Sequence, residues 1–283
     1  DVLKAKIRML ARMVRGAANP VAFTGAGISV AAGIDDYASK NRGGNRQNRP
    51  AAAAAASAAP AAAPAAAPAR LRDWKDAKPT RAHRVLTAMH FAGLLPHWIQ
   101  QNHDSLPQKA GFPQRCLNEI HGSLHDPSNP VVPYEGSLRD DLYEWMCEWR
   151  SKADLCIAVG TSLSGFNVDT VPEAIAARQV AAAAAAAAAT TAASAVGTSA
   201  GGEGGGGGGA TPYGLVLINL QQTPYDEVCS LRLFCKADEA MAALEEELGL
   251  GEDVGRLEEQ AEQAEQAEQV LPPQCVVEED MFR

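Results

Sequence analysis

Apolar residues along the chain follow two patterns, one with helical spacing and one of short continuous runs. Helical spacing predicts amphipathic helices over residues 4–18, 80–93, 138–152 and 239–248. Short apolar runs predict buried strands over residues 21–24, 94–99, 155–159 and 215–218. Because helices and strands alternate, we expect an α/β fold in which helices flank a parallel sheet.

The predicted strands end in small or polar residues. The segments that follow them are Gly25-Ala26-Gly27, Gln101-Asn102, Gly160-Thr161-Ser162 and Asn219-Leu220-Gln221. The carboxyl ends of parallel strands meet at one edge of a sheet, where ligands bind. We therefore expect these segments to furnish a single binding site.

The first of these turns has the form that a dinucleotide's phosphates need. Gly25 and Gly27 lack a Cβ, so the chain can turn tightly and bring backbone N–H groups close to a pyrophosphate. A helix that starts near Ser29 would add its positive end. Val30 replaces the usual third glycine of the dinucleotide motif, however, and many glycine turns bind nothing. A purely structural turn therefore stays open as an alternative.

Two low-complexity segments interrupt the chain. Residues 51–69 contain alanine, proline and one serine, and residues 181–210 contain alanine followed by glycine and small polar residues. Without large apolar side chains, both are expected to be flexible insertions and not core elements. The chain is thus predicted to form one nucleotide-binding domain over residues 1–245, followed by an acidic tail over residues 246–283.

The formal net charge of −9 comes from that tail, because residues 245–268 contain ten acids and the single base Arg256. The rest of the chain lacks the basic surplus of a nucleic-acid-binding protein, so no direct nucleic acid binding is expected. The repeating Glu-Gln-Ala segment from Glu259 to Gln269 could be a solvated helix or disordered, and an exposed helix without chemistry is favoured.

The six cysteines form no C-x-x-C pair, which argues against a zinc quartet and a dense disulfide framework. A reducing, intracellular compartment fits best, although its identity is not resolved. No run of large apolar residues is long enough to cross a bilayer, so no membrane association is expected. The oligomeric state cannot be deduced from these patterns.

Five segments, taken in order, resemble the sirtuin family of NAD-dependent protein deacylases. They are Thr24-Gly25-Ala26-Gly27-Ile28-Ser29 with Gly33-Ile34, Gln101-Asn102-His103-Asp104, His121-Gly122-Ser123, Gly160-Thr161-Ser162-Leu163 and Ile218-Asn219-Leu220-Gln221. Pro79-Thr80-Arg81-Ala82-His83 and Lys236-Ala237-Asp238-Glu239 also resemble family segments. The likeness covers most of residues 5–245 outside the two insertions.

The resemblance implies a Rossmann-like NAD-binding fold that acts on an acyl-lysine protein substrate. The implied cofactor-binding residues are Gly25, Ala26, Gly27, Ser29, Asp36, Gln101, Asn102, Asp104, Gly160, Thr161, Ser162, Asn219, Leu220, Gln221 and Ala237. The implied catalytic residues are His121 as general base, with Asn102 and Asp104 framing the nicotinamide and its ribose. A histidine suits proton removal because its ordinary pKa is about 6.5. Alternatively, His121 is a loop residue without a role and Asp104 is a turn-stabilising acid.

Three departures from the family pattern bear on activity. Asp35 and Ala38 stand where the family usually has a proline and an arginine, and Pro107 stands where it has a histidine. Loss of the guanidinium would remove a charge-assisted contact to phosphate. The family's zinc ribbon with two C-x-x-C pairs is also missing, because only residues 124–129 separate His-Gly-Ser from Pro130. We therefore expect no structural zinc and a reduced small domain.

Other histidines and tryptophans admit two interpretations. His121 and His125 are four residues apart, but Pro127 makes a shared metal site unconvincing. The spacing of seven among His83, His90 and His97 marks one helix and its exit. Trp145 and Trp149 could form an aromatic platform, but their helical spacing favours core packing.

The sequence leaves two functional hypotheses in view. The first is an NAD-dependent protein-lysine deacylase, which transfers the acyl group to ADP-ribose and releases nicotinamide, or transfers ADP-ribose itself. The second is a catalytically impaired module that binds NAD or ADP-ribose as a sensor or scaffold, which Ala38 and Pro107 favour. A plain α/β domain without a nucleotide would require five chance matches.

Overall fold

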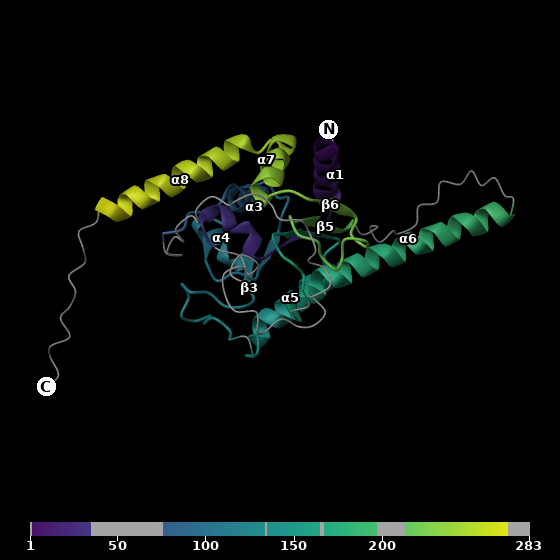
Figure 1. Ribbon diagram of the computed structural model, residues 1–283, viewed down its shortest axis with the longest axis horizontal. Helices are drawn as coiled ribbons and strands as arrows, with labels where there is room; N and C mark the ends of the chain where they lie inside the picture. Colours follow the sequence, from purple (N-terminus) through teal and green to yellow (C-terminus); the bar gives the residue numbers. More distant parts are fainter. Residues whose placement is uncertain (1, 35–75, 134, 165–166, 197–212, 271–283) are drawn as a thin grey trace, which may run out of the picture.

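The computed structural model describes residues 2–34, 76–133, 135–164, 167–196 and 213–270 of the chain. Its centre is a six-stranded sheet of order β3-β2-β1-β4-β5-β6, in which every neighbouring pair is parallel (Figure 1). The strands are β1 (Pro20–Thr24), β2 (His97–Gln100), β3 (Leu117–Glu119), β4 (Leu155–Val159), β5 (Gly214–Ile218) and β6 (Leu231–Leu233). This order reverses between β1 and β4, as in doubly wound dinucleotide-binding folds. The predicted Rossmann-like sheet is confirmed.

Helices cover both faces of the sheet. They are α1 (Val2–Gly16), α3 (Arg81–Phe91), α4 (Leu106–Lys109), α5 (Asp140–Lys152), α6 (Thr170–Val196), α7 (Ala237–Leu248) and α8 (Gly251–Val270). None of the helices among the described residues combines the length and hydropathy that crossing a bilayer requires.

Alternate residues of the central strands enter different cores, as the strand period of two demands. Ala22 and Ile157 pack in the core under α1, α3 and α7. Phe23 and Ala158 pack in the core under α5 and α6. The sheet is therefore buried on both faces, and its carboxyl edge is left for the loops.

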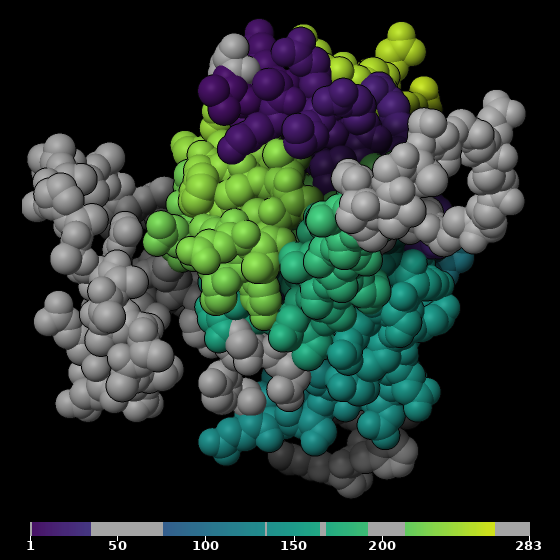
Figure 2. Space-filling view, turned by 90° about the vertical axis from the view of Figure 1, so that its right-hand side faces the viewer, coloured from purple at the N-terminus to yellow at the C-terminus, as the bar shows by residue number. Residues whose placement is uncertain are grey.

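Residues from distant parts of the sequence close the β6 side of the sheet. Nζ of Lys6 in α1 donates to the carbonyl oxygen of Arg232 in β6 at 2.6 Å. Figure 2 shows α1 in purple lying against the lime-coloured segment that follows residue 213. This contact covers part of β6, so the outer strand is not a free edge over its full length.

Helix α3 begins as predicted at Pro79-Thr80. The hydroxyl of Thr80 accepts a hydrogen bond from the backbone N–H of His83 at 3.5 Å, and Nδ1 of His83 accepts from the backbone N–H of Thr80 at 3.2 Å. This reciprocal arrangement is a capping box with histidine in place of the usual glutamate. His83 and His90 lie on α3 and His97 begins β2, as the spacing of seven predicts.

The expected helix near Ser29 is wrong. Residues Ala26–Ile28 and Val30–Ala32 form two short 3₁₀ turns instead, and the second ends at Gly33 in the left-handed region (φ 86°). Two turns of three residues each do not build an appreciable helix dipole.

The expectation of a flexible insertion from residue 181 is wrong for residues 181–196, which continue helix α6. Alanine has the highest helix propensity, so the alanine run extends the helix that residues 170–180 begin. The alanines from 183 to 189 are exposed, so these residues add no core. The predicted tail helix is confirmed as α8, which projects from the body on the side opposite to α6 (Figure 1).

Candidate active site

The turn after β1 packs directly against the turn after β4. The backbone N–H of Gly25 donates to the carbonyl of Val159 at 3.2 Å, and the N–H of Gly27 donates to the carbonyl of Gly160 at 2.7 Å. A Cβ on Gly27 would lie 2.7 Å from Cα of Gly160, closer than real Cβ contacts allow. Gly160 itself is left-handed, with φ 64°. Glycine at these positions lets the two strand ends meet.

This packing corrects the expected role of the two glycine amides. The N–H groups of Gly25 and Gly27 donate to protein carbonyls and are not offered to a phosphate. Among the described residues, the N–H of Ala26 between them has no partner. The glycines remain candidates for cofactor contact through their small size, with Ala26 as the available donor.

Ser29 and Asn102 are tied to the same turn. The hydroxyl of Ser29 donates to Oδ2 of Asp104 at 2.7 Å. Nδ2 of Asn102 donates to Oγ of Ser29 and to the carbonyl of Gly25, both at 3.1 Å. The Asn102 amide is therefore held beside the glycine turn, and its Oδ1 accepts no hydrogen bond from the residues that the structure describes.

Asp104 is buried, and both of its carboxyl oxygens are used within the protein. While Oδ2 accepts from Ser29, Oδ1 accepts from Nε2 of Gln100 and from the backbone N–H of Leu106, both at 3.1 Å. These contacts correspond to the turn-stabilising alternative. Asp104 thus holds Ser29, which in turn accepts a hydrogen bond from Asn102.

A buried chain of hydrogen bonds holds Gln100, whose Nε2 donates to Asp104. The indole Nε1 of Trp98 donates to the hydroxyl of Thr24 at 2.8 Å, and that hydroxyl donates to Oε1 of Gln100 at 3.0 Å. All three side chains are completely buried. Sequence reasoning missed these supporting residues, because nothing in an apolar strand pattern shows which side chains meet between neighbouring strands.

His121 lies shortly after β3, at the same edge of the sheet. Its Nδ1 lies 3.1 Å from the carbonyl oxygen of Gln101. A carbonyl only accepts, so Nδ1 carries the proton and Nε2 keeps its lone pair when the ring is neutral. Burial lowers the pKa of His121 from its ordinary value, opposed by the Gln101 hydrogen bond and aided by nearby His103. The ring is therefore prepared to accept a proton at Nε2 near neutral pH.

Gln101 connects the end of β2 to the end of β4 and to the segment before α6. Its Oε1 accepts from the hydroxyl of Thr161 at 3.1 Å, and its Nε2 donates to Oδ1 of Asp169 at 3.2 Å. Nδ2 of Asn219 donates to the carbonyl of Thr161 at 2.9 Å, which brings in the end of β5. The segments after β1, β2, β4 and β5 thus form one continuous edge, as predicted.

Within the described part of the chain, two residues that are not glycine adopt left-handed backbone, and both adjoin predicted site segments. Ser105 (φ 53°) follows Asp104, and Leu163 (φ 49°) follows Ser162. Such conformations cost about 1–3 kcal/mol each and cluster at functional sites. Ser105 is held by a 2.8 Å hydrogen bond between its hydroxyl and that of Ser123.

The remaining predicted residues are placed as follows. Ser162, Leu220 and Gln221 are exposed at the edge. Ala237 begins α7, which packs against the turn at Ala26–Ile28. Asp36, like Asp35 and Ala38, lies outside the described residues.

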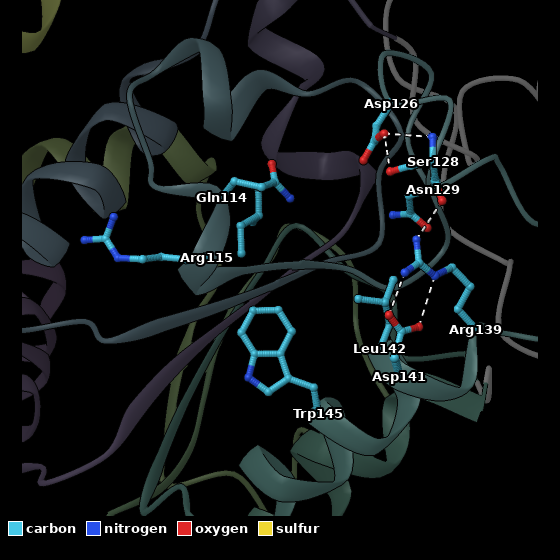
Figure 3. A pocket seen from close by; sticks show the side chains of 10 residues that line it. Gln114, Arg115, Asp126, Ser128, Asn129, Arg139, Asp141, Leu142 and Trp145 are labelled. Carbon is cyan, nitrogen blue, oxygen red and sulfur yellow. Dashed lines mark hydrogen bonds and ion pairs between the residues drawn. The ribbon is translucent and has the colours of Figure 1, made fainter.

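Two surface cavities of the described part lie away from this edge. One of about 450 Å³ lies between the start of β3 and the start of α5 (Figure 3). The ring of Trp145 forms one wall, and Arg139 pairs with Asp141 at the other side. A second, of about 640 Å³, lies over α7 near Arg81. Neither cavity is lined by a predicted site residue, so the candidate site is defined here by the hydrogen-bonded edge of the sheet.

Aromatic packing mostly follows the core interpretation. Trp149 is buried and stacks on His97, with ring centroids 4.4 Å apart and planes 6° apart. Trp145 is half-buried and also contacts His97, at 4.4 Å. His121 and His125 do not share a helix. Among the described residues, no three His, Cys, Asp or Glu side chains are grouped to hold a metal ion.

Comparison with known proteins relates these features to one family. A family model described as "Sir2 family" matches residues 25–131. The NAD-dependent protein deacetylase sirtuin-7 of Rattus norvegicus is 30% identical over 264 residues, covering 88% of this chain and 61% of that protein. The chain therefore spans less than two thirds of that relative's length. An NAD-dependent protein deacetylase of Sulfolobus acidocaldarius is 26% identical over 263 residues, covering 81% of this chain and 90% of that protein.

Solved structures share the fold. Sir2Tm bound to a propionylated peptide superposes with a TM-score of 0.57 at 20% identity, covering 87% of this chain and all of that one. A Sir2 complex with a p53 peptide and NAD+ gives a TM-score of 0.56 at 18% identity, covering 87% of this chain and 99% of that one. At this identity the likeness establishes the architecture alone.

Proposed function

We infer that this chain, which belongs to the sirtuin (Sir2) family, is an NAD-dependent protein deacetylase. The observation that carries the inference is the placement of His121, whose Nδ1 is bound to Gln101 at the same sheet edge as the glycine turn. The relatives named as NAD-dependent protein deacetylases support the cofactor and the reaction.

The residues at this edge fit NAD. A Cβ on Gly25 or Gly27 would collide with the segment after β4, so glycine keeps the two strand ends in contact. The backbone N–H of Ala26 has no partner among the described residues and is available to a phosphate oxygen. Exposed Leu220 and Gln221 extend the edge toward an adenosine ribose. Ser162 and Ala237 complete the proposed adenosine half.

The catalytic roles follow from the hydrogen bonds. When bound, NAD supplies the nicotinamide–ribose bond, whose cleavage lets an acyl-lysine transfer its acyl group to ADP-ribose. Asn102, anchored to Gly25 and Ser29, orients the nicotinamide end. His121 accepts a proton at Nε2 from a ribose hydroxyl, because Nδ1 is already protonated and bound to Gln101. Asp104 acts as a positioning residue, because it holds Ser29, to which Asn102 is bound.

The proposed substrate is an acyl-lysine side chain of a protein, and the proposed location is an intracellular compartment. Acetyl-lysine is the simplest case, and a broader acyl range or ADP-ribose transfer are variants of the same chemistry. Gly122, next to His121, is left-handed (φ 85°), and a Cβ there would collide with Pro130. The backbone beside the proposed base therefore packs closely against Pro130, which fixes its position.

The test is release of nicotinamide from NAD in the presence of an acetyl-lysine peptide. The wild-type chain should release nicotinamide and form deacetylated peptide, and His121→Ala should lower the rate by roughly 10²–10⁴, the usual contribution of a general base. His121→Ala should still bind ADP-ribose. Wild-type protein that binds ADP-ribose but never releases nicotinamide would instead support a sensor or scaffold, the alternative that Ala38 and Pro107 favour.

A further inference from the structure

Arg232 is a buried cation beside the proposed adenosine edge. It lies in β6, and only 8% of its side chain is exposed. Its Nε donates to Oδ1 of Asp226 at 2.8 Å. The two remaining nitrogens donate to three backbone carbonyls, those of Asn219, Leu233 and Gln221. Such use of the whole guanidinium fork is available to arginine and not to lysine.

Asp226 closes the loop that these carbonyls belong to. Besides Arg232, its Oδ1 accepts from the backbone N–H of Thr223 at 3.2 Å and from the Thr223 hydroxyl at 2.8 Å. One carboxylate and one guanidinium therefore hold the chain from residue 219 to residue 226. At the other end, the Asn219 amide binds the carbonyl of Thr161 and so fixes the loop to β4.

The held carbonyls determine where the loop's N–H groups point. The peptide bonds of the described chain are trans, so each N–H points opposite to the carbonyl of the same peptide unit. With the carbonyls of Asn219 and Gln221 turned toward Arg232, the N–H groups of Leu220 and Gln222 point away from it. Neither N–H has a partner among the described residues, and both residues are exposed.

We propose that Arg232, paired with Asp226, is a positioning residue that presets the backbone of residues 219–222 to donate N–H groups to the adenosine ribose of the nucleotide. This rests on the proposed function. Arg232 does not contact the nucleotide itself, because it is buried and its guanidinium lies 3.6 Å from the centre of the Phe234 ring. Its effect is transmitted through the peptide units that it holds.

The experiment compares the wild-type chain of residues 1–283 with Arg232→Lys. Lysine keeps the charge but cannot hold three carbonyls and a carboxylate together. The dissociation constants of ADP-ribose and AMP should rise about tenfold, the equivalent of losing one charge-assisted hydrogen bond. The KM for NAD should rise in parallel, while kcat at saturating NAD and inhibition by free nicotinamide stay unchanged. This split separates positioning of the adenosine half from general damage.

Arg139→Lys is the matched control. Arg139 also binds a carboxylate, that of Asp141, and a carbonyl, that of Ser128, but on the exposed surface away from this edge. The Arg139→Lys variant should leave the dissociation constants of ADP-ribose and AMP, the KM for NAD and kcat unchanged. If Arg232→Lys does not fold, Asp226→Asn serves as the test variant, because it removes the ion pair with Arg232. It should also raise the dissociation constant of ADP-ribose without changing kcat, but by a smaller factor.

The outcomes separate the two proposals. Unchanged ADP-ribose affinity in a folded Arg232→Lys, or an equal fall in kcat, overturns the positioning role and leaves the proposed function intact. Wild-type protein that binds neither ADP-ribose nor AMP overturns the nucleotide site itself, and the positioning role with it.

Discussion

Nδ1 of His121 donates to the carbonyl oxygen of Gln101 over 3.1 Å, and burial lowers the pKa of the same ring. A general base works in its neutral form, which predominates above its pKa. The acid limb of the kcat/KM profile should therefore have its midpoint below 6.5, the ordinary histidine value. Nicotinamide release measured from pH 4.5 to 9 checks this. A midpoint at or above 6.5 would contradict the assignment of His121 as the buried base.

Asp104→Asn should weaken both the fold and the reaction. Oδ1 must stay an oxygen, because two N–H groups donate to it, so the new amide nitrogen would face the Ser29 hydroxyl, which donates to Oδ2 in the wild type. Loss of this charge-assisted bond in a buried site should cost about 1–3 kcal/mol of unfolding free energy.

Because Asn102 is anchored to Ser29, kcat should fall more than ADP-ribose affinity in Asp104→Asn. Urea denaturation and turnover measure the two effects. Asp141→Asn is the control, since its carboxylate is 62% exposed and solvent screens its pairing with Arg139, so its loss should change stability less than Asp104→Asn does. Equal stability of Asp104→Asn and the control would refute the positioning role.

Gly27→Ala should be strongly destabilising, because its Cβ would lie 2.7 Å from Cα and 2.8 Å from the carbonyl oxygen of Gly160. Backbone on both sides cannot yield as a flexible side chain could, so a loss of roughly 1–3 kcal/mol is expected. Gly255→Ala in α8 meets nothing within 4 Å and should be neutral or stabilising by up to about 1 kcal/mol. Thermal melts of both variants test the pair, and a Gly27→Ala variant as stable as wild type would disprove the tight turn-to-turn packing.

His97 should make the protein less stable in acid. Burial, aided by the charge of Lys152, lowers the pKa of His97 to about 3. Above pH 6.5 the ring is neutral in both states. As the pH falls from 6.5 toward 3, the unfolded chain binds a proton that the folded chain does not, so unfolding becomes easier by up to about 1.4 kcal/mol per pH unit.

His97→Phe keeps a ring to stack on Trp149 and should remove one proton's worth of this pH dependence. Urea melts at pH 7, 6 and 5 measure it. The near-ultraviolet circular dichroism of the tryptophans serves as the control for intact packing. An unchanged slope with pH would show that His97 is protonated equally in both states.

The sequence predicts the central sheet well, because β1, β4 and β5 are continuous apolar runs. It misses β3 and β6, each of three residues, since Asn118, Glu119 and Arg232 interrupt the apolar pattern although all are buried. Nδ2 of Asn118 donates to the carbonyl of Leu142 and Arg232 binds Asp226, both outside their own strands, whereas Oδ1 of Asn118 and Oε1 of Glu119 have no partner among the described residues. A pattern of hydrophobicity does not contain such partners.

The candidate site shows the same limit. The apolar runs predict that residues 25–27, 102 and 160–162 lie at the ends of strands, and the structure confirms this. What each one binds was not, because the Asp104–Ser29 and Gly27–Gly160 contacts join segments 75 residues or more apart. The glycine turn was therefore placed correctly, whereas its amides were assigned to a ligand when they bind the neighbouring turn.

Helices α6 and α8 leave the body in opposite directions (Figure 1). At 27 residues, α6 is roughly 40 Å long, comparable to the diameter of a small domain. Friction with solvent depends on such extensions far more than on mass. A 29.7 kDa chain with this outline should diffuse and sediment more slowly than a sphere of equal weight, and gel filtration alone would overstate how many copies associate.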